Sequence, residues 1–128
     1  MDEGNTAEII CQVKNALCED VRIIPVELAV RIGDKPAMFI RQLHYWLEKS
    51  KHKYHGKKWV YNTYEGWKEN FPWLSVRTIQ RMVYELEQLG LIETGDFNKM
   101  KYDKTKWYTI NYEVLGAYYG IDKLAKSL

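Results

Sequence analysis

The chain has 128 residues, of which 46% are hydrophobic and 28% charged, with a formal net charge of +2. A chain of this length can bury one modest core but hardly two, so we expect a single domain over residues 1–128. No run reaches the roughly 18 apolar residues of a membrane-spanning helix, and residues 1–5 are acidic rather than signal-like, so we expect a soluble, cytoplasmic protein without a membrane partner.

Residues 1–22 are expected to form an N-terminal helical extension. Thr6 is placed to cap a helix that runs to about Leu17. Cys11 and Cys18 project from nearly the opposite side to the apolar stripe and lie about 10 Å apart along the helix, beyond disulfide reach, so reduced thiols are expected. Burial of both thiols would cover both helix faces and indicate a dimer contact, whereas partly exposed thiols near a frayed terminus are the alternative. The stripe consists of Ile9, Ile10, Val13, Ala16 and Leu17.

Residues 24–111 are expected to form the core of the domain. Residues 25–32 give a short helix or turn, and Gly33 separates them from a helix that Asp34 caps, with Pro36 in its first turn. The core face of that helix is predicted to be Phe39, Ile40, Leu43, Trp46 and Leu47. After it we expect a lysine-rich loop over residues 49–58 and then a short strand, Trp59 to Asn62, which would join a later hairpin as the third strand of a small sheet.

Two helices joined by a tight turn follow the strand. Thr63 is a plausible N-cap for a helix whose one face carries Tyr64, Trp67 and Phe71, and Pro72 then forces the chain to turn. Ser75 caps the next helix, of which one side is apolar and the other cationic and hydrogen-bonding. The apolar side is Ile79, Met82, Val83, Leu86 and Leu89, and the outer side is Arg77, Arg81, Tyr84 and Gln88.

A hairpin with a basic tip comes next. Gly90 lies where a left-handed helix cap is expected, and the runs 91–94 and 107–110 are strand-like. The polar residues 98–106 between them are long enough to be a wing. The tail, 112–128, is expected to be helical to Tyr119 and again after Gly120. It offers Leu115, Tyr118, Ile121 and Leu124 for packing or self-association. The fold predicted is α+β and mostly helical: a winged helix-turn-helix with a small antiparallel sheet and extra N- and C-terminal helices.

Charge is segregated along the chain. Residues 1–34 hold three basic and seven acidic residues, a net −4, whereas residues 41–58 hold six basic residues and one acidic, a net +5. Residues 98–106 add four lysines against one aspartate. Such segregation creates a surface that attracts phosphate, so double-stranded DNA is the expected partner.

Catalysis is not expected. The sequence has no glycine-rich phosphate loop, no convincing nucleophile with a matching base and no carboxylate cluster for a metal. His52 and His55 lack a cysteine pair nearby, so no metal and no cofactor is predicted. Most aromatic side chains should be core, but Tyr54, Tyr84 and Tyr102 are candidates for stacking on unpaired bases.

The predicted mechanism inserts the helix from Ser75 to Leu89 into the major groove. Arg77 and Arg81 would contact guanine edges or phosphates, Gln80 adenine, and Ser75 and Thr78 backbone phosphates, with Tyr84 on the same outer face. Lys99, Lys101, Lys104 and Lys106 would hold flanking phosphate or the minor groove. Lys51, Lys53, Lys57 and Lys58 would add nonspecific attraction.

Several blocks of the chain together resemble a known family. They are residues 42–47 (QLHYWL), 56–63 (GKKWVYNT), Trp67 with Phe71-Pro72, Ser75-x-Arg77-Thr78-Ile79-x-Arg81, Leu86-Glu87-x-x-Gly90-Leu91-Ile92 and Thr105-Lys106-Trp107-Tyr108. Residues 24–115 thus resemble the amino-terminal winged-helix domain of phage and plasmid replication initiators, the replisome-organiser and DnaD-like proteins of Gram-positive bacteria.

The resemblance implies a cytoplasmic protein that binds duplex origin DNA as a homodimer or higher oligomer and helps to recruit replication machinery. The chain departs from the family by ending at Leu128, before the segment with which such initiators commonly contact helicase-loading proteins. A transcriptional repressor of similar fold would use the same chemistry. A protein-interaction or oligomerisation module of a primosome is the third interpretation, in which the outer helix face docks a protein instead.

Overall fold

The computed structural model describes residues 3–19, 21–103 and 105–119, and side chains from Thr6 onward within these ranges. This part of the chain is α+β. Its helices are α1 (Glu3–Cys18), α2 (Val26–Ile32), α3 (Asp34–Lys49), α4 (Tyr64–Asn70), α5 (Val76–Gln88) and α6 (Tyr112–Tyr118). Its strands are β1 (His52–Tyr54), β2 (Lys57–Asn62), β3 (Ile92–Gly95) and β4 (Lys106–Ile110). No helix in the described ranges is long and apolar enough to cross a membrane.

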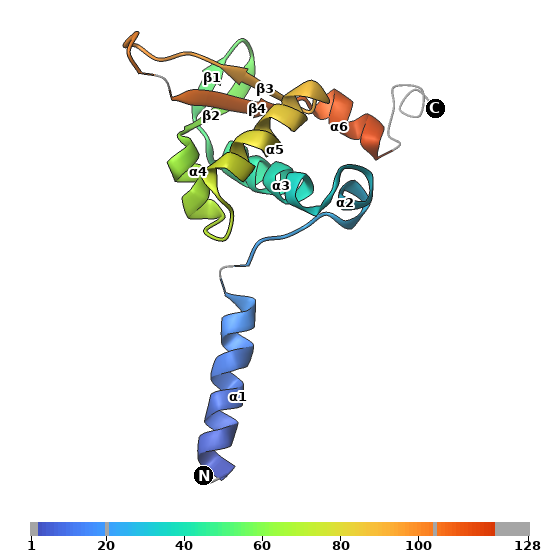
Figure 1. Cartoon of the computed structure of the whole chain (residues 1–128), viewed down its shortest axis with the longest axis vertical. Coiled ribbons are helices and arrows are strands. Elements are labelled where there is room, and N and C mark those ends of the chain that lie inside the picture. The colour runs from blue at the N-terminus through green and yellow to red at the C-terminus, as the bar shows by residue number, and fades with distance from the viewer. Residues whose placement is uncertain (1–2, 20, 104, 120–128) are drawn as a thin grey trace.

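Helices and sheet enclose one core. The strands form an antiparallel sheet in the order β1-β2-β4-β3, and α3, α4 and α5 gather below it in Figure 1. An aromatic group at the centre joins the layers: the ring centroid of Phe39 lies 4.7 Å from that of Trp67, 6.1 Å from that of Phe71 and 6.4 Å from that of Tyr108. Since these rings come from α3, α4, the turn after α4 and β4, their packing fixes how the helices sit on the sheet.

The sheet is larger than the sequence predicted. The expected lysine-rich loop over residues 49–58 is mostly a hairpin, in which β1 pairs with the first residues of β2. His55 and Gly56 form its turn with φ angles of 55° and 76°, the left-handed conformations that a two-residue hairpin turn requires. The sequence did not indicate this strand because all residues of β1 are exposed, so β1 lacks the alternation of apolar and polar residues that marks a half-buried strand.

The two helices on either side of the tight turn begin as predicted. Thr63 Oγ1 accepts a hydrogen bond from Gly66 N over 3.0 Å, and Ser75 Oγ accepts one from Thr78 N over 3.1 Å. These caps satisfy backbone donors that the first helical turn leaves free. The caps therefore fix the start of α4 and of α5, and so the position of the turn between them.

The end of α5 corrects the expectation for Leu89, which is 45% exposed instead of part of the core. The helix stops in a left-handed cap: Gly90 has a φ of 75°, its N–H donates to Glu87 O, and Leu91 N donates to Leu86 O, each over 3.0 Å. This pattern is the Schellman motif. Leu91 is fully buried in place of Leu89.

Helix α3 differs from the prediction at both ends. Its N-cap is Gly33, with a φ of 100°, and Asp34 is the first helical residue, whose Oδ1 accepts from Lys35 N over 2.9 Å. Trp46 was expected in the core but is partly exposed, and its Nε1 donates instead to Asn70 Oδ1.

Helix α1 projects away from the rest of the molecule (Figure 1). It begins at Glu3, so Thr6 lies inside the helix and is not its cap. Both of its cysteines are free thiols and exposed, and the apolar stripe is exposed as well. Within one chain, therefore, neither face of α1 is covered.

The predicted C-terminal helix begins with α6, which Asn111 caps by accepting from Val114 N over 3.2 Å. Leu115 and Tyr118 pack against the core and are partly buried. Ile121, Leu124 and the helix expected after Gly120 lie outside the described residues.

Candidate nucleic-acid interface

The outer face of α5 presents a row of polar side chains to solvent. Arg77, Gln80 and Arg81 project from it, and Tyr84 is 63% exposed. The opposite side of the helix is buried, through Ile79, Met82, Val83 and Leu86. The packing of α5 thus turns two cations, an amide and a phenol outward on one surface. Side chains of these kinds donate hydrogen bonds to base edges and to phosphate oxygens.

A hollow of about 520 Å³, here called the α5 hollow, lies beside the first turns of this helix. Thr78 and Arg81 line it together with Lys35 of α3 and Trp73 of the turn before α5. Ser75 also lines it, but its hydroxyl donates to Thr78 Oγ1 over 2.9 Å while accepting the cap bond. The outward donor at this end is therefore the Thr78 hydroxyl, with the two cations beside it.

Lys35 and Trp73 were missed by the sequence prediction. Lys35 lies 40 residues before Ser75, and only the packing of α3 near the start of α5 brings it to the hollow. Trp73 could have been found, because a large aromatic residue in a tight turn between two helices has little room to be buried. Its ring is 60% exposed and stands edge-on to Phe71, with centroids 6.0 Å apart.

The loop between β3 and β4, residues 96–105, contains most of the segment 98–106 that was predicted to be a wing. Asn98 organises its base: Nδ2 donates to the carbonyls of Asp103 over 3.0 Å and Thr105 over 2.8 Å. Thr105 N donates to the Asp103 carboxylate, and this hydrogen bond lowers the pKa of Asp103. Lys99 and Lys101 project from the loop as exposed side chains. The loop therefore has a defined base and a basic, solvent-facing tip.

The other two lysines of the predicted wing differ from these. Lys104 lies outside the described residues. Lys106 belongs to β4, is half-buried, and holds its Nζ 5.5 Å from the ring centroid of Tyr64, a cation–π contact. The structure thus does not group Lys106 with the exposed loop lysines.

The lysines of the β1–β2 hairpin form a second basic group. Lys53 and Lys58 are directly opposite one another across the two strands, a like-charge pair that costs stability. Lys57 Nζ is paired with Glu93 Oε2 over 2.6 Å, so its charge is partly neutralised. Lys51, Lys53 and Lys58 are all exposed. An anion beside Lys53 and Lys58 would relieve their repulsion.

An aromatic cluster joins the hairpin to the β3–β4 loop. The rings of Tyr54 and Phe97 are stacked, 4.4 Å between centroids and 5° between planes. Phe97 also lies over Gly95, where a Cβ atom would come within 2.7 Å of its ring. Tyr54 is therefore already stacked within the chain, whereas the other two tyrosines considered for base stacking, Tyr84 and Tyr102, are 63% and 79% exposed.

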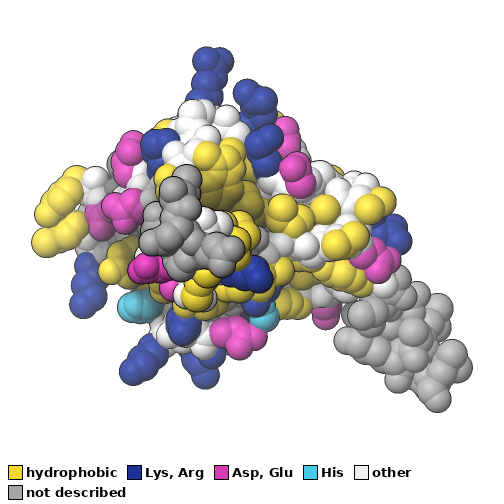
Figure 2. All heavy atoms as spheres, turned by 90° about the horizontal axis from the view of Figure 1, so that it is seen from below, with side chains coloured by type: hydrophobic (Ala, Val, Ile, Leu, Met, Phe, Trp, Pro, Cys, Tyr) yellow, Lys and Arg dark blue, Asp and Glu magenta, His cyan; other side chains and the backbone are white. Residues whose placement is uncertain are grey.

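The basic side chains do not form one continuous surface. Figure 2, a view of the molecule from the α1 end, shows Lys and Arg side chains projecting from several edges with acidic side chains between them. In the described ranges, no group of three or more His, Cys, Asp or Glu residues is arranged to hold a metal ion.

No family model, curated protein or solved structure matches the chain.

Proposed function

We propose that the chain is a cytoplasmic winged helix-turn-helix protein that binds double-stranded DNA through the outer face of α5. The observation that carries the proposal is the outward row of Arg77, Gln80 and Arg81 beside the α5 hollow, into which Lys35 adds a further cation. An amphipathic helix that follows a short turn and exposes a cationic face has the character of a recognition helix.

In this proposal α5 enters the major groove by its amino-terminal half. Arg77 and Arg81 are placed to donate bidentate hydrogen bonds to guanine, and Gln80 to contact adenine. Thr78 and Lys35 bind the phosphates that flank the groove. The β3–β4 loop acts as the wing, with Lys99 and Lys101 on the adjoining backbone, and the hairpin lysines add electrostatic attraction that does not depend on sequence.

The biological role proposed is replication initiation of the phage and plasmid type, on the strength of the sequence blocks that resemble such initiators. A transcriptional repressor of similar fold would bind DNA through the same residues, and the two roles differ in which sites are bound. Selection of bound duplexes from a random pool, followed by their mapping to an origin or to a promoter, separates them.

The test of DNA reading compares Arg77→Ala and Arg81→Ala with wild type in fluorescence anisotropy titrations on a selected duplex and on random DNA. Each variant is expected to lose about 1 to 3 kcal/mol on the selected duplex and much less on random DNA, since a hydrogen bond to a base is removed. Arg31→Ala is the matched control, because this exposed arginine of α2 pairs with Glu27 and does not lie on α5. Wild-type affinity of both α5 variants for the selected duplex would refute the proposal in favour of a protein-docking face.

A further inference from the structure

The exposed stripe on α1 needs a partner. Ile9, Ile10, Val13 and Leu17 are between 46% and 72% exposed, although they share one side of a 16-residue helix. A helix of this length has only marginal stability in water without a packed face. Four large apolar side chains in one stripe are typical of a surface that another protein element covers.

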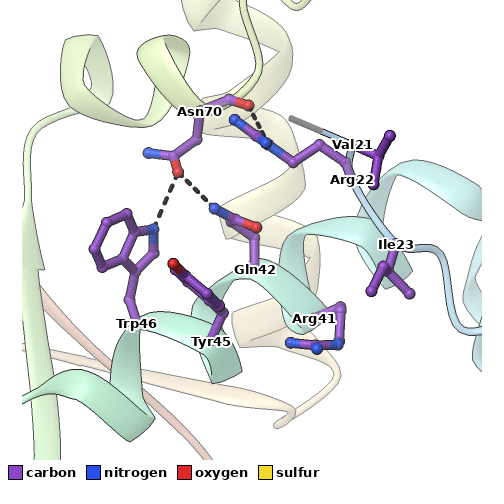
Figure 3. Close-up of a pocket in the computed structure, with 8 residues that line it drawn as sticks. All are labelled: Val21, Arg22, Ile23, Arg41, Gln42, Tyr45, Trp46 and Asn70. Atoms are coloured by element: carbon purple, nitrogen blue, oxygen red, sulfur yellow. Dashed lines mark hydrogen bonds between the residues drawn. The ribbon is translucent and has the colours of Figure 1, made fainter. Parts of the chain in front are cut away.

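A groove of about 460 Å³ lies where the segment before α2 meets α3 and the end of α4 (Figure 3). Arg22 and Ile23 of the segment before α2 form one wall, Arg41 and Tyr45 of α3 form the floor, and Asn70 at the end of α4 closes the top. Its lining also includes Val21, Gln42 and Trp46. We call this the Arg22–Arg41 groove.

The groove is preformed by hydrogen bonds that converge on Asn70. Its Oδ1 accepts from Gln42 Nε2 over 2.7 Å and from Trp46 Nε1 over 3.0 Å. Its backbone oxygen accepts from Arg22 Nε over 2.8 Å, which ties the segment before α2 to the end of α4. These bonds, drawn as dashed lines in Figure 3, hold the walls apart without filling the space between them.

The groove is lined by apolar as well as polar side chains. Val21, Ile23, Tyr45 and Trp46 are each more than a third exposed. The lining holds no carboxylate, and the described residues give Arg41 no ion-pair partner. An occupant of this groove should thus be apolar on one side and negatively charged.

We propose that α1 of a second copy of the chain occupies the Arg22–Arg41 groove, and that two copies exchange their α1 helices reciprocally about a twofold axis. The apolar stripe supplies the contact for Ile23, Tyr45 and Trp46. The charges also match, since residues 3–19 contain three glutamates and one lysine, a net −2, and the groove carries the Arg41 guanidinium. Both the uncovered stripe and the open groove are then explained by one interface.

The chain geometry favours exchange over return to the same body. α1 ends at Cys18, and the anchored Arg22 is separated from it by residues 19–21 alone. Helix α1 runs away from the body (Figure 1), so its own groove is reached only if those residues reverse the chain direction completely. A second copy, approaching in the opposite direction, meets the helix as it stands.

A simple pairing of two α1 helices explains less. Ile10, Val13 and Leu17 fit a heptad pattern, but 16 residues make only about two heptads, whereas about three to four are typical of a stable coiled coil. The stripe alone is also small beside the roughly 1,200 Å² or more that stable interfaces bury. Contact with the body of the partner adds the area that is missing.

The test is complementation between two defective chains, read as molar mass by size-exclusion chromatography with light scattering. Val13→Glu damages the stripe and leaves the groove intact, whereas Arg41→Glu with Tyr45→Ser damages the groove and leaves α1 intact. Wild type is expected at the mass of two 15.3 kDa chains and each variant at the mass of one. An equimolar mixture of the two variants is expected to restore a dimer, because the intact α1 of one fits the intact groove of the other.

Controls make each outcome decisive. Val30→Glu changes an apolar side chain of α2 that is 82% exposed and outside the groove, and it should remain dimeric. Circular dichroism verifies that every variant is folded, as expected for positions outside the buried core. A monomeric wild type, or variants that dimerise like wild type, overturns the proposal. Variants that are monomeric alone and stay monomeric when mixed also overturn it, because the intact α1 of one variant then fails to bind the intact groove of the other. None of these outcomes depends on DNA binding.

Discussion

The indole Nε1 of Trp107 donates to Asn98 Oδ1 over 2.9 Å and so ties the β3–β4 loop to the sheet. Asn98 Nδ2 donates in turn to two backbone carbonyls of the same loop, Asp103 O and Thr105 O. One amide side chain therefore holds both ends of the loop base against a buried tryptophan. A basic loop that is organised in this way loses less conformational entropy when its tip binds phosphate.

Replacement of Asn98 by Ala should loosen the loop. The change leaves the Trp107 indole and two carbonyls without their partner, so we expect a loss of about 1 to 3 kcal/mol in the free energy of unfolding, measured by urea titration. Duplex affinity should fall to a similar degree on every sequence. Tyr102→Ala, at a highly exposed position in the same loop, is the control and should leave stability unchanged. Equal stability of the Asn98 variant and wild type would show that the network does not hold the loop.

Neutralisation of the loop tip should alter the salt dependence of binding. We expect Lys99→Ala with Lys101→Ala to weaken affinity for all duplexes alike and to reduce the slope of log affinity against log salt by about one unit for each phosphate that is no longer bound. Lys57→Ala is a suitable comparison, since its ammonium already pairs with Glu93 and should contribute less. An unchanged slope in the double variant would remove the loop from the interface.

The two sides of α5 should fail in different ways when mutated. Leu86 is fully buried, so Leu86→Ala is expected to lower the free energy of unfolding by about 2 to 5 kcal/mol through reduced burial and a residual cavity. Arg77→Ala and Arg81→Ala should leave the melting temperature nearly unchanged, because these side chains lie on the outer face. Calorimetry of the three variants provides the measurement. A large destabilisation by either arginine variant would mean that its side chain supports the fold.

Local signals were sufficient to predict the helices around the tight turn. Thr63, Ser75 and Gly90 each act through hydrogen bonds within a few residues of themselves, so their roles can be read from the sequence. The position of Leu89 was misjudged because a stripe drawn at helical spacing does not show where a helix ends. The bend at Gly90 carries Leu91 into the core in its place.

The missed features depend on interactions between distant segments. Strand β1 has no alternating apolar residues that would mark it as a strand. Its one aromatic ring, that of Tyr54, stacks on Phe97, which is 43 residues further along the chain. Lys35 reaches the α5 hollow only because α3 packs near the start of α5. Pairings of this kind follow from tertiary structure, and no pattern within a single sequence segment indicates them.

Trp73 and Lys35 should contribute to binding at the start of α5. Both line the α5 hollow with Arg81, so we expect Lys35→Ala to weaken duplex binding by removing a cation from a phosphate, and Trp73→Ala to weaken it by removing apolar surface from the interface. Each effect should appear on selected and random duplexes alike, in contrast to the sequence-selective effect expected for Arg77. Lys14→Ala, a change of a lysine on α1, is the control. Normal affinity of both hollow variants would place the DNA elsewhere on α5.

The facing pair of Lys53 and Lys58 leads to a test in which stability and binding change in opposite directions. Because like charges directly opposite in a sheet repel, Lys53→Gln should raise the free energy of unfolding by about 0.2 to 1 kcal/mol at low salt, and the gain should shrink as salt screens the pair. If the hairpin binds phosphate, the same substitution should weaken duplex affinity and lower the salt slope. Urea titrations and anisotropy on one protein preparation measure both quantities.

Lys51→Gln, which removes a charge without a facing lysine, should weaken binding without the gain in stability. A Lys53 variant that is more stable but binds duplex as wild type does would assign the hairpin lysines to solvation alone and restrict the DNA interface to α5 and the β3–β4 loop.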